Sequence, residues 1–135
     1  MKKILIIDDD SYKADSAERA LRNIFNSKGE ETNFERAEHM RDVMLLDKSG
    51  ELQSFNLIIL DMNFPMYHRE RVQLGLGNSV IHRINHRKYD VPIIVFTSEP
   101  DLLREDSENI IGTVKFESSV WDEPKFEEVI NNHFI

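Results

Sequence analysis

Cysteine is absent from the 135-residue sequence, and its absence excludes several classes of protein. Disulfide scaffolds, zinc knuckles and enzymes with a thiol nucleophile all need cysteine side chains. Long apolar runs are missing as well, since none exceeds about five residues and a membrane helix needs ~20. We therefore expect a domain that folds without disulfide bonds, has no membrane partner and resides in the cytoplasm.

Positive charge is scarce relative to negative charge. The chain has 17 lysine and arginine residues against 25 aspartate and glutamate residues, which gives a formal net charge of −8 at pH 7. A field of this sign repels nucleic acid and anionic membrane surfaces. We therefore expect no direct nucleic-acid partner.

Internal repeats, low-complexity tracts and linkers are missing too. A length of 135 residues suits one domain that buries roughly two-thirds of the surface of its unfolded chain. We expect residues 1–135 to form a single domain with no effector domain attached.

Short apolar runs are the main feature that the sequence does have. Three of them are continuous and mostly aliphatic, at residues 4–7, 57–60 and 93–96. Runs of this length suit strands buried on both faces, as in a parallel sheet covered by helices, although a buried helical turn has the same pattern. Weaker runs at residues 110–114 and 32–38 predict two further strands.

Helical periodicity fills the intervals between these runs. Apolar residues recur at helical spacing over residues 11–28, 38–47, 78–88 and 124–134, and a weaker candidate spans 101–107. A strand is thus followed by a helix five times. This order predicts an α/β fold with a five-stranded parallel sheet, right-handed crossovers and helices on both faces. Residues 66–77 are polar and aperiodic, so we expect a long loop or insertion there.

The residues directly after the predicted strands are the candidates for chemistry, because ligands of open parallel sheets bind beyond the carboxyl ends of the strands. They are Asp8, Asp9, Asp10, Asp61, Thr97, Ser98 and Lys115. Clustered carboxylates repel one another, and a hard divalent cation such as Mg²⁺ removes that cost. Mg²⁺ beside a lysine and a hydroxyl suits phosphoryl transfer, because Lys115 and the metal neutralise phosphoryl oxygens and Thr97 hydrogen-bonds one of them.

These residues stand in four separated motifs: Ile-Leu-Ile-Ile-Asp8-Asp9, Leu-Ile-Ile-Leu-Asp61-Met-Asn-Phe-Pro65, Val-Phe-Thr97-Ser98 and Val114-Lys115. The set resembles the receiver domain of two-component response regulators, the CheY-like family, over nearly the whole chain. The resemblance implies a flavodoxin-like, doubly wound (βα)5 fold with three α/β/α layers. It also implies signal transduction through an aspartyl phosphate.

The resemblance assigns roles to individual residues. Asp61 is the implied phospho-acceptor, and the implied donor is a phosphohistidine of a sensor histidine kinase or a histidine phosphotransfer protein. Asp8 and Asp9 are implied to hold Mg²⁺ together with Asp61 and the backbone carbonyl of Asn63. Such a chain is not an enzyme with a separate substrate, but it catalyses its own phosphorylation and dephosphorylation.

The same resemblance implies a conformational switch. Thr97 is the implied switch hydroxyl, and Lys115 is the cation that pairs with the phosphoryl group. The output is then modulation of a downstream protein, or onward relay of the phosphoryl group. Asn63 and Glu99 lie two residues after Asp61 and Thr97, where an amide and a carboxylate can position the water that hydrolyses the acyl phosphate.

Some positions depart from the family pattern. Phe116 follows Lys115 where the family usually has proline, and Gly112 stands where many members carry an aromatic residue. The segment from Thr97 to Lys115 is short, so we expect the fourth helix to be short or distorted. Asp10 is an extra acid that we expect to cap the first helix.

Two alternatives remain open at this point. The first is a pseudo-receiver, a binding module of the same fold that works independently of phosphorylation, and the altered Gly112 and Phe116 positions favour it. The second is a phosphatase of the haloacid-dehalogenase type with Asp8 as nucleophile, because Ile-Ile-Asp8-Asp9-Asp10-Ser11 resembles that family's Asp-x-Asp motif.

Overall fold

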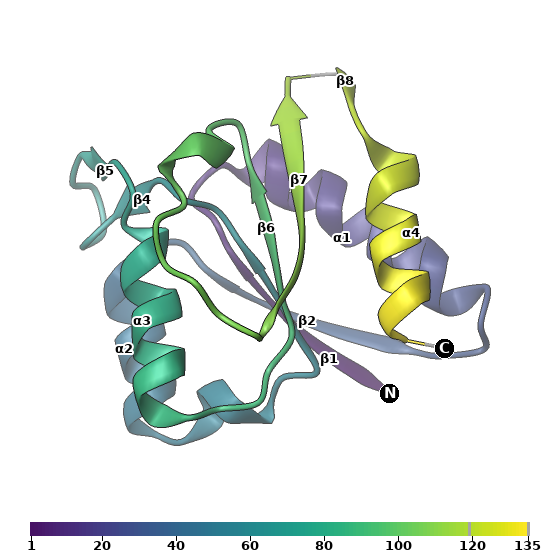
Figure 1. The fold of residues 1–135 in the computed structure, drawn as a ribbon, viewed down its shortest axis with the longest axis horizontal. Helices are drawn as coiled ribbons and strands as arrows, with labels where there is room; N and C mark the ends of the chain where they lie inside the picture. Colours follow the sequence, from purple (N-terminus) through teal and green to yellow (C-terminus); the bar gives the residue numbers. More distant parts are fainter. Residues whose placement is uncertain (119, 135) are drawn as a thin grey trace.

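A central sheet organises the chain in the computed structural model, which describes residues 1–118 and 120–134 (Figure 1). Its strand order is β2-β1-β3-β6-β7-β8. The strands are β1 (Lys2–Ile7), β2 (Thr32–Ala37), β3 (Leu57–Leu60), β6 (Ile93–Thr97), β7 (Ile110–Glu117) and β8 (Val120–Trp121). The first five in this order are parallel, as predicted. The continuous apolar runs of β1, β3 and β6 are buried on both faces of the sheet, as is usual for parallel strands covered by helices.

The strand count differs from the prediction by one, because β8 adds a sixth strand at the edge of the sheet. β8 pairs antiparallel with β7, through Phe116 with Trp121 and Glu117 with Val120. The pairing holds the ring of Trp121 against Phe96, with ring centroids 4.9 Å apart. Aromatic burial therefore continues the sheet beyond the fifth predicted strand.

In the described residues, four helices cover the sheet in two layers (Figure 1). α1 (Ser11–Asn26) and α4 (Glu123–His133) pack on one face, and α2 (Met40–Lys48) and α3 (Gly77–Arg87) pack on the other. A short 3-10 turn, η1 (Glu51–Ser54), leads from α2 into β3. In the part of the chain that the structure describes, no helix is both long and apolar enough to cross a membrane.

The weak helix predicted at residues 101–107, the fourth in chain order, does not form as a full helix, in line with the expectation that it is short or distorted. One 3-10 turn, η2 (Pro100–Leu102), stands there, followed by an extended segment. Asn78 on α3 holds that segment: its side chain donates to the carbonyl of Leu102 and accepts from the backbone N–H groups of Arg104 and Glu105. The connection is too short for a full helix, and these bonds satisfy its backbone instead.

The aperiodic segment at residues 66–77 lies mostly in a small hairpin beside the main sheet. β4 (Phe64–Pro65) and β5 (Val72–Gln73) pair antiparallel. The backbone N–H of Arg41 on α2 donates to the carbonyl of Met66, which fastens the hairpin to α2.

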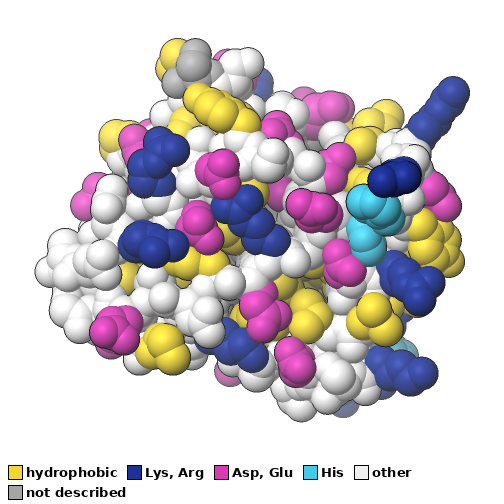
Figure 2. Space-filling model, turned by 180° about the vertical axis from the view of Figure 1, so that it is seen from behind, with side chains coloured by type: hydrophobic (Ala, Val, Ile, Leu, Met, Phe, Trp, Pro, Cys, Tyr) yellow, Lys and Arg dark blue, Asp and Glu magenta, His cyan; other side chains and the backbone are white. Residues whose placement is uncertain are grey.

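The surface mixes both signs of charge. On the face shown in Figure 2, acidic and basic side chains are interspersed, with hydrophobic side chains between them. Below the surface, Asp47 of α2 is one of several buried polar residues. Its buried carboxylate accepts hydrogen bonds from Arg83 and Tyr89 at 2.9 and 3.0 Å, which ties α2 to α3.

Candidate functional site

The candidate site lies where the carboxyl ends of β1, β3 and β6 meet. In the sheet, β1 lies between β2 and β3. The chain passes from β1 to its neighbour β2 on one side, and then crosses over β1 to reach β3 on the other side. A reversal of this kind is the topological switch point at which open α/β sheets bind ligands. The structure brings the predicted Asp8, Asp61 and Thr97 to this rim, because each follows or ends one of these strands.

Three carboxylates converge at the rim. One oxygen from each of Asp8, Asp9 and Asp61 lies within 4.8 Å of the others. Asp8 and Asp61 are buried, with 3% and 6% of their surface exposed, whereas Asp9 is exposed. The sequence therefore predicted the acidic members of the cluster, and only one of them faces solvent freely.

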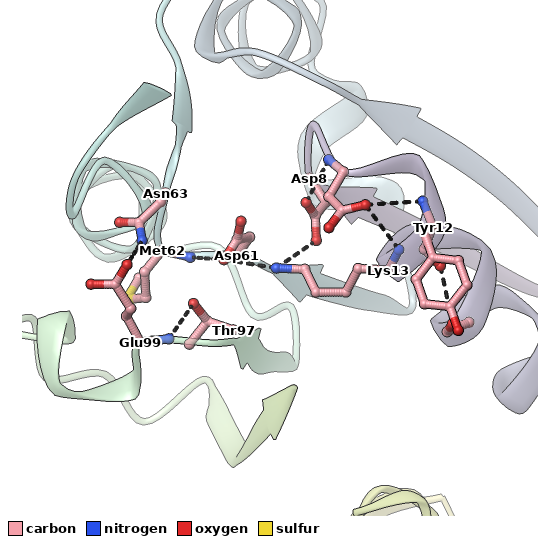
Figure 3. A network of polar contacts seen from close by, with 10 residues as sticks. Asp8, Tyr12, Lys13, Asp61, Met62, Asn63, Thr97 and Glu99 are labelled. Carbon is pink, nitrogen blue, oxygen red and sulfur yellow. Dashed lines mark hydrogen bonds and ion pairs between the residues drawn. The ribbon is translucent and has the colours of Figure 1, made fainter. Parts of the chain in front are cut away.

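An ammonium group that the sequence did not predict lies between two of these acids. Lys13 Nζ is 3.0 Å from Asp8 Oδ2 and 3.0 Å from Asp61 Oδ1, and only 5% of the Lys13 side chain is exposed (Figure 3). Lys13 comes from the first turn of α1. That turn is fixed by Asp10, which caps α1 as predicted by accepting from the N–H groups of Tyr12 and Lys13.

The burial of these charges alters their ionisation. Desolvation, with the neighbouring Asp61 charge, raises the pKa of Asp8 from 3.8 to about 8 even though Lys13 opposes the shift. Desolvation also raises the pKa of Asp9. Burial alone would lower the pKa of Lys13, but the two carboxylates outweigh it and raise that pKa. Lys13 is therefore positive at neutral pH, and Asp8 holds a proton readily.

The second half of the site joins β3 to β6. Asn63 Nδ2 donates to Glu99 Oε1 at 3.2 Å, and the backbone N–H of Glu99 contacts Thr97 Oγ1 at 3.3 Å (Figure 3). Asn63 Oδ1 also accepts from the N–H of Gly75 at 2.8 Å. The structure thus places the proposed lifetime-tuning pair in direct contact beside the fully buried Thr97.

Lys115 is the predicted site residue that the structure does not bring to the carboxylates. Its backbone pairs with Thr97 in the sheet register, but its side chain is half exposed and contacts Glu117 at 2.6 Å. That contact raises the pKa of Lys115, through the hydrogen bond first and the charge second. Val114 and Phe116 are buried, so strand alternation turns Lys115 and Glu117 to the same outer side.

The acid cluster fits a divalent metal ion by its donor chemistry. Carboxylate oxygens and a nearby backbone carbonyl are the hard ligands that Mg²⁺ takes in proteins. Asp8, Asp9 and Asp61 would supply the carboxylates, and the carbonyl of Asn63 follows Asp61 at the end of β3. A metal held there would neutralise negative charge on a bound phosphoryl group.

Sequence reasoning missed two residues of the site. Lys13 lies four residues before Ala17 and eight before Leu21, at the spacing of one helix face. This spacing could have predicted that Lys13 lies on the buried face of α1. Gly77 begins α3, and a Cβ built on it would lie 2.6 Å from the carbonyl oxygen of Asp61 and 2.9 Å from Met62 Cα. The absent side chain lets α3 approach the Asp61 loop, a contact that no periodicity reveals.

The fold is shared with solved receiver domains. A signal receiver domain of a DNA-binding response regulator from Colwellia psychrerythraea is 20% identical, with 98% of each chain covered and a TM-score of 0.61. The response regulator TrrA from Thermotoga maritima, in complex with Mg²⁺-BeF, is 23% identical at the same coverage and TM-score. A bacteriophytochrome response regulator, RtBRR, is 16% identical, covering 100% of this chain and 79% of its own, with a TM-score of 0.67.

No protein-family model matches the sequence, and no curated protein matches it. The structural likeness is nevertheless consistent over almost the whole chain. The chain therefore has the fold of a response regulator receiver domain, with a mostly parallel sheet between two helical layers. The predicted fold class is confirmed, apart from the extra edge strand and the segment 101–107, where one 3-10 turn stands in place of a helix.

Proposed function

We propose that this chain is a receiver that accepts a phosphoryl group on Asp61. The observation that carries the proposal is the convergence of Asp8, Asp9 and Asp61 at the switch point of a receiver fold, beside the buried hydroxyl of Thr97. The donor is a phosphohistidine of a histidine kinase or a histidine phosphotransfer protein. The chain is not an enzyme with a substrate of its own, but it catalyses its own phosphorylation and dephosphorylation.

The chemistry is an in-line displacement at phosphorus. An Asp61 carboxylate oxygen forms the new O–P bond as the P–N bond of the phosphohistidine breaks, and the released imidazole nitrogen takes up a proton. Asp8, Asp9, Asp61 and the carbonyl of Asn63 would hold Mg²⁺, which would supply positive charge against the phosphoryl oxygens. Hydrolysis reverses the gain, as water attacks phosphorus and restores the Asp61 carboxylate.

The switch follows from the groups that can reach the new phosphoryl oxygens. Thr97 donates its hydroxyl to one of them, and Lys115 exchanges Glu117 for another. Because Phe96 precedes Thr97 and packs against Trp121, a shift of Thr97 passes into the β7–β8 edge. The output is a changed surface that modulates a downstream protein, or transfer of the phosphoryl group to a further histidine.

Intact-mass measurement after incubation with acetyl phosphate and Mg²⁺ tests the proposal. The wild type should gain the mass of one phosphoryl group, and Asp61→Asn should gain nothing. A receiver that refuses small donors should still respond to beryllofluoride in the presence of Mg²⁺. No mass gain and no beryllofluoride response would overturn the proposal.

One observation favours a second candidate, a phosphorylation-independent binding module. Lys13 fills the space between Asp8 and Asp61, and Lys115 contacts Glu117 on the outer surface. A chain that serves only as a binding module does not need the carboxylate of Asp8 or of Asp61 to be available for a metal ion or a phosphoryl group. The mass measurement separates the two functions, because only a phosphoryl acceptor changes mass.

A further inference from the structure

Lys13 is a buried cation that the proposed chemistry does not use. Its ammonium contacts both of the buried acids, at 3.0 Å each, and solvent reaches only 5% of its side chain. A lysine in such a position is stable only with opposite charge around it. The two acids lie at contact distance from the ammonium and hold the cluster together in the absence of any metal.

We propose that Lys13 is a built-in counter-cation that competes with Mg²⁺ for the Asp8 and Asp61 carboxylates, and that metal binding displaces it. This inference rests on the proposed function, because it concerns the same acid site. A metal dication and an ammonium cannot share the two carboxylates at contact distance without strong repulsion. Lys13 thereby sets the Mg²⁺ concentration at which the site loads and becomes competent for phosphorylation.

The structure offers the displaced side chain a place to go. Lys13 lines an open groove of about 580 Å³ whose other walls include Asp10, Ser98 and Glu117. The carboxylates of Asp10 and Glu117 are exposed. A cation that enters the groove therefore lies near opposite charge and keeps its hydration shell. An ammonium that pairs with Glu117 also releases Lys115, whose backbone lies opposite Thr97 in the register.

The chain supplies a matched control for a test of Lys13. Lys125 is also the third residue of its helix, and its N–H is also accepted by an aspartate cap, Asp122. It differs in being exposed to solvent. Lys13→Met and Lys125→Met thus remove the same charge from equivalent helix positions, one inside the acid site and one outside it.

Calorimetric titration with Mg²⁺ is the first measurement. Lys13→Met should bind Mg²⁺ about tenfold more tightly than the wild type or more, because no ammonium opposes the metal. Lys125→Met should stay within about twofold of the wild type. Equal or weaker binding by Lys13→Met overturns the inference but leaves the proposed function standing. If neither the wild type nor Lys13→Met binds Mg²⁺, the metal site of the proposed function falls with it.

A measurement on the wild type guards against a variant that does not fold. Lysines are acetylated with acetic anhydride with and without saturating Mg²⁺, and modified peptides are quantified by mass spectrometry. Lys13 should be protected without metal and severalfold more reactive with it, whereas Lys125 should react equally in both. Protection of Lys13 that persists at saturating Mg²⁺ overturns the displacement.

Discussion

Asn63 and Glu99 are joined by a hydrogen bond of 3.2 Å that spans the ends of β3 and β6. The two residues lie 36 positions apart in the chain, and the sheet brings them together beside Thr97. Both offer polar atoms at the place where a hydrolytic water would approach Asp61. We infer that this pair positions the water that removes the phosphoryl group.

Removal of either partner should lengthen the phosphorylated lifetime. Asn63→Ala and Glu99→Ala should each slow dephosphorylation severalfold. The effect should be smaller than the ~100-fold loss of rate expected on removal of a general base, because each residue orients the water and neither alone takes its proton. Loss of the phosphorylated mass over time measures the rate. Glu108→Ala, an exposed acid on the same connection, is the control. Unchanged rates in both variants would contradict this role.

Gly77 should tolerate no side chain. Gly77→Ala places a methyl group against the backbone of Asp61 and Met62, and we expect a loss of about 1–3 kcal/mol in the free energy of unfolding. Urea unfolding measures the loss. Ser79→Ala, at an exposed position of the same helix, should change stability by less than about 0.5 kcal/mol. An equal effect of the two substitutions would show that the close approach of α3 is not a constraint.

Gly112 should be constrained by α4. A Cβ on Gly112 would lie 2.8 Å from both methyl groups of Val129, so the helix occupies the space that a side chain would take. Gly112→Ala should destabilise the fold by about 1–3 kcal/mol, and Val129→Ala in the same chain should recover part of the loss. A double-mutant cycle by urea unfolding measures the coupling. Strict additivity would place the strain elsewhere.

The metal-free protein should lose stability as the pH rises. Folded Asp8 keeps its proton up to a pKa of about 8, whereas unfolded Asp8 releases it near 3.8, so the folded state binds more protons between these values. The free energy of unfolding must then decrease with rising pH across this window. Lys13 stays charged throughout, because its pKa is raised above 10.5.

Urea unfolding in EDTA measures this dependence. From about pH 5 to about pH 9 we expect a fall of at least ~1.4 kcal/mol, the value of one pKa unit. Asp8→Asn should flatten the profile, because it removes the titrating group. Asp47, whose pKa is lowered by Arg83 and its other partners despite burial, acts only at more acidic pH. A wild-type profile that rises over this range would exclude a proton held by Asp8.

Much of the fold could be predicted from the sequence because its central strands are continuous apolar runs. The runs at β1, β3 and β6 have no polar interruptions, and runs of this length favour strands buried on both faces. The short segment from Thr97 to Lys115 predicted a short or distorted fourth helix, but the sequence did not show what replaces it. The side chain of Asn78, distant in sequence, bonds the backbone of Leu102 and Arg104 there. β8 depends on ring packing around Trp121, which is also a tertiary effect.

The candidate site was predictable to the same degree. The acids and Thr97 stand at strand ends, and topology alone brings strand ends together. Lys13 was missed because a lysine in a first helical turn is usually solvated, and only the buried stripe of α1 marks it. The side chain of Lys115 points outward because β7 continues past it to Glu117. No pattern in the sequence indicates that the strand continues this far.

Phosphorylation of Asp61 is tested most directly by chemical trapping of the aspartyl phosphate. The protein is treated with acetyl phosphate and Mg²⁺, then with borohydride, which reduces an aspartyl phosphate to homoserine, and the modified position is found by peptide mass mapping. We expect homoserine at position 61 alone, dependent on the donor and on Mg²⁺, and none in Asp61→Asn. Homoserine at position 8 instead, or at no position in a protein that also ignores beryllofluoride, would contradict phosphorylation of Asp61.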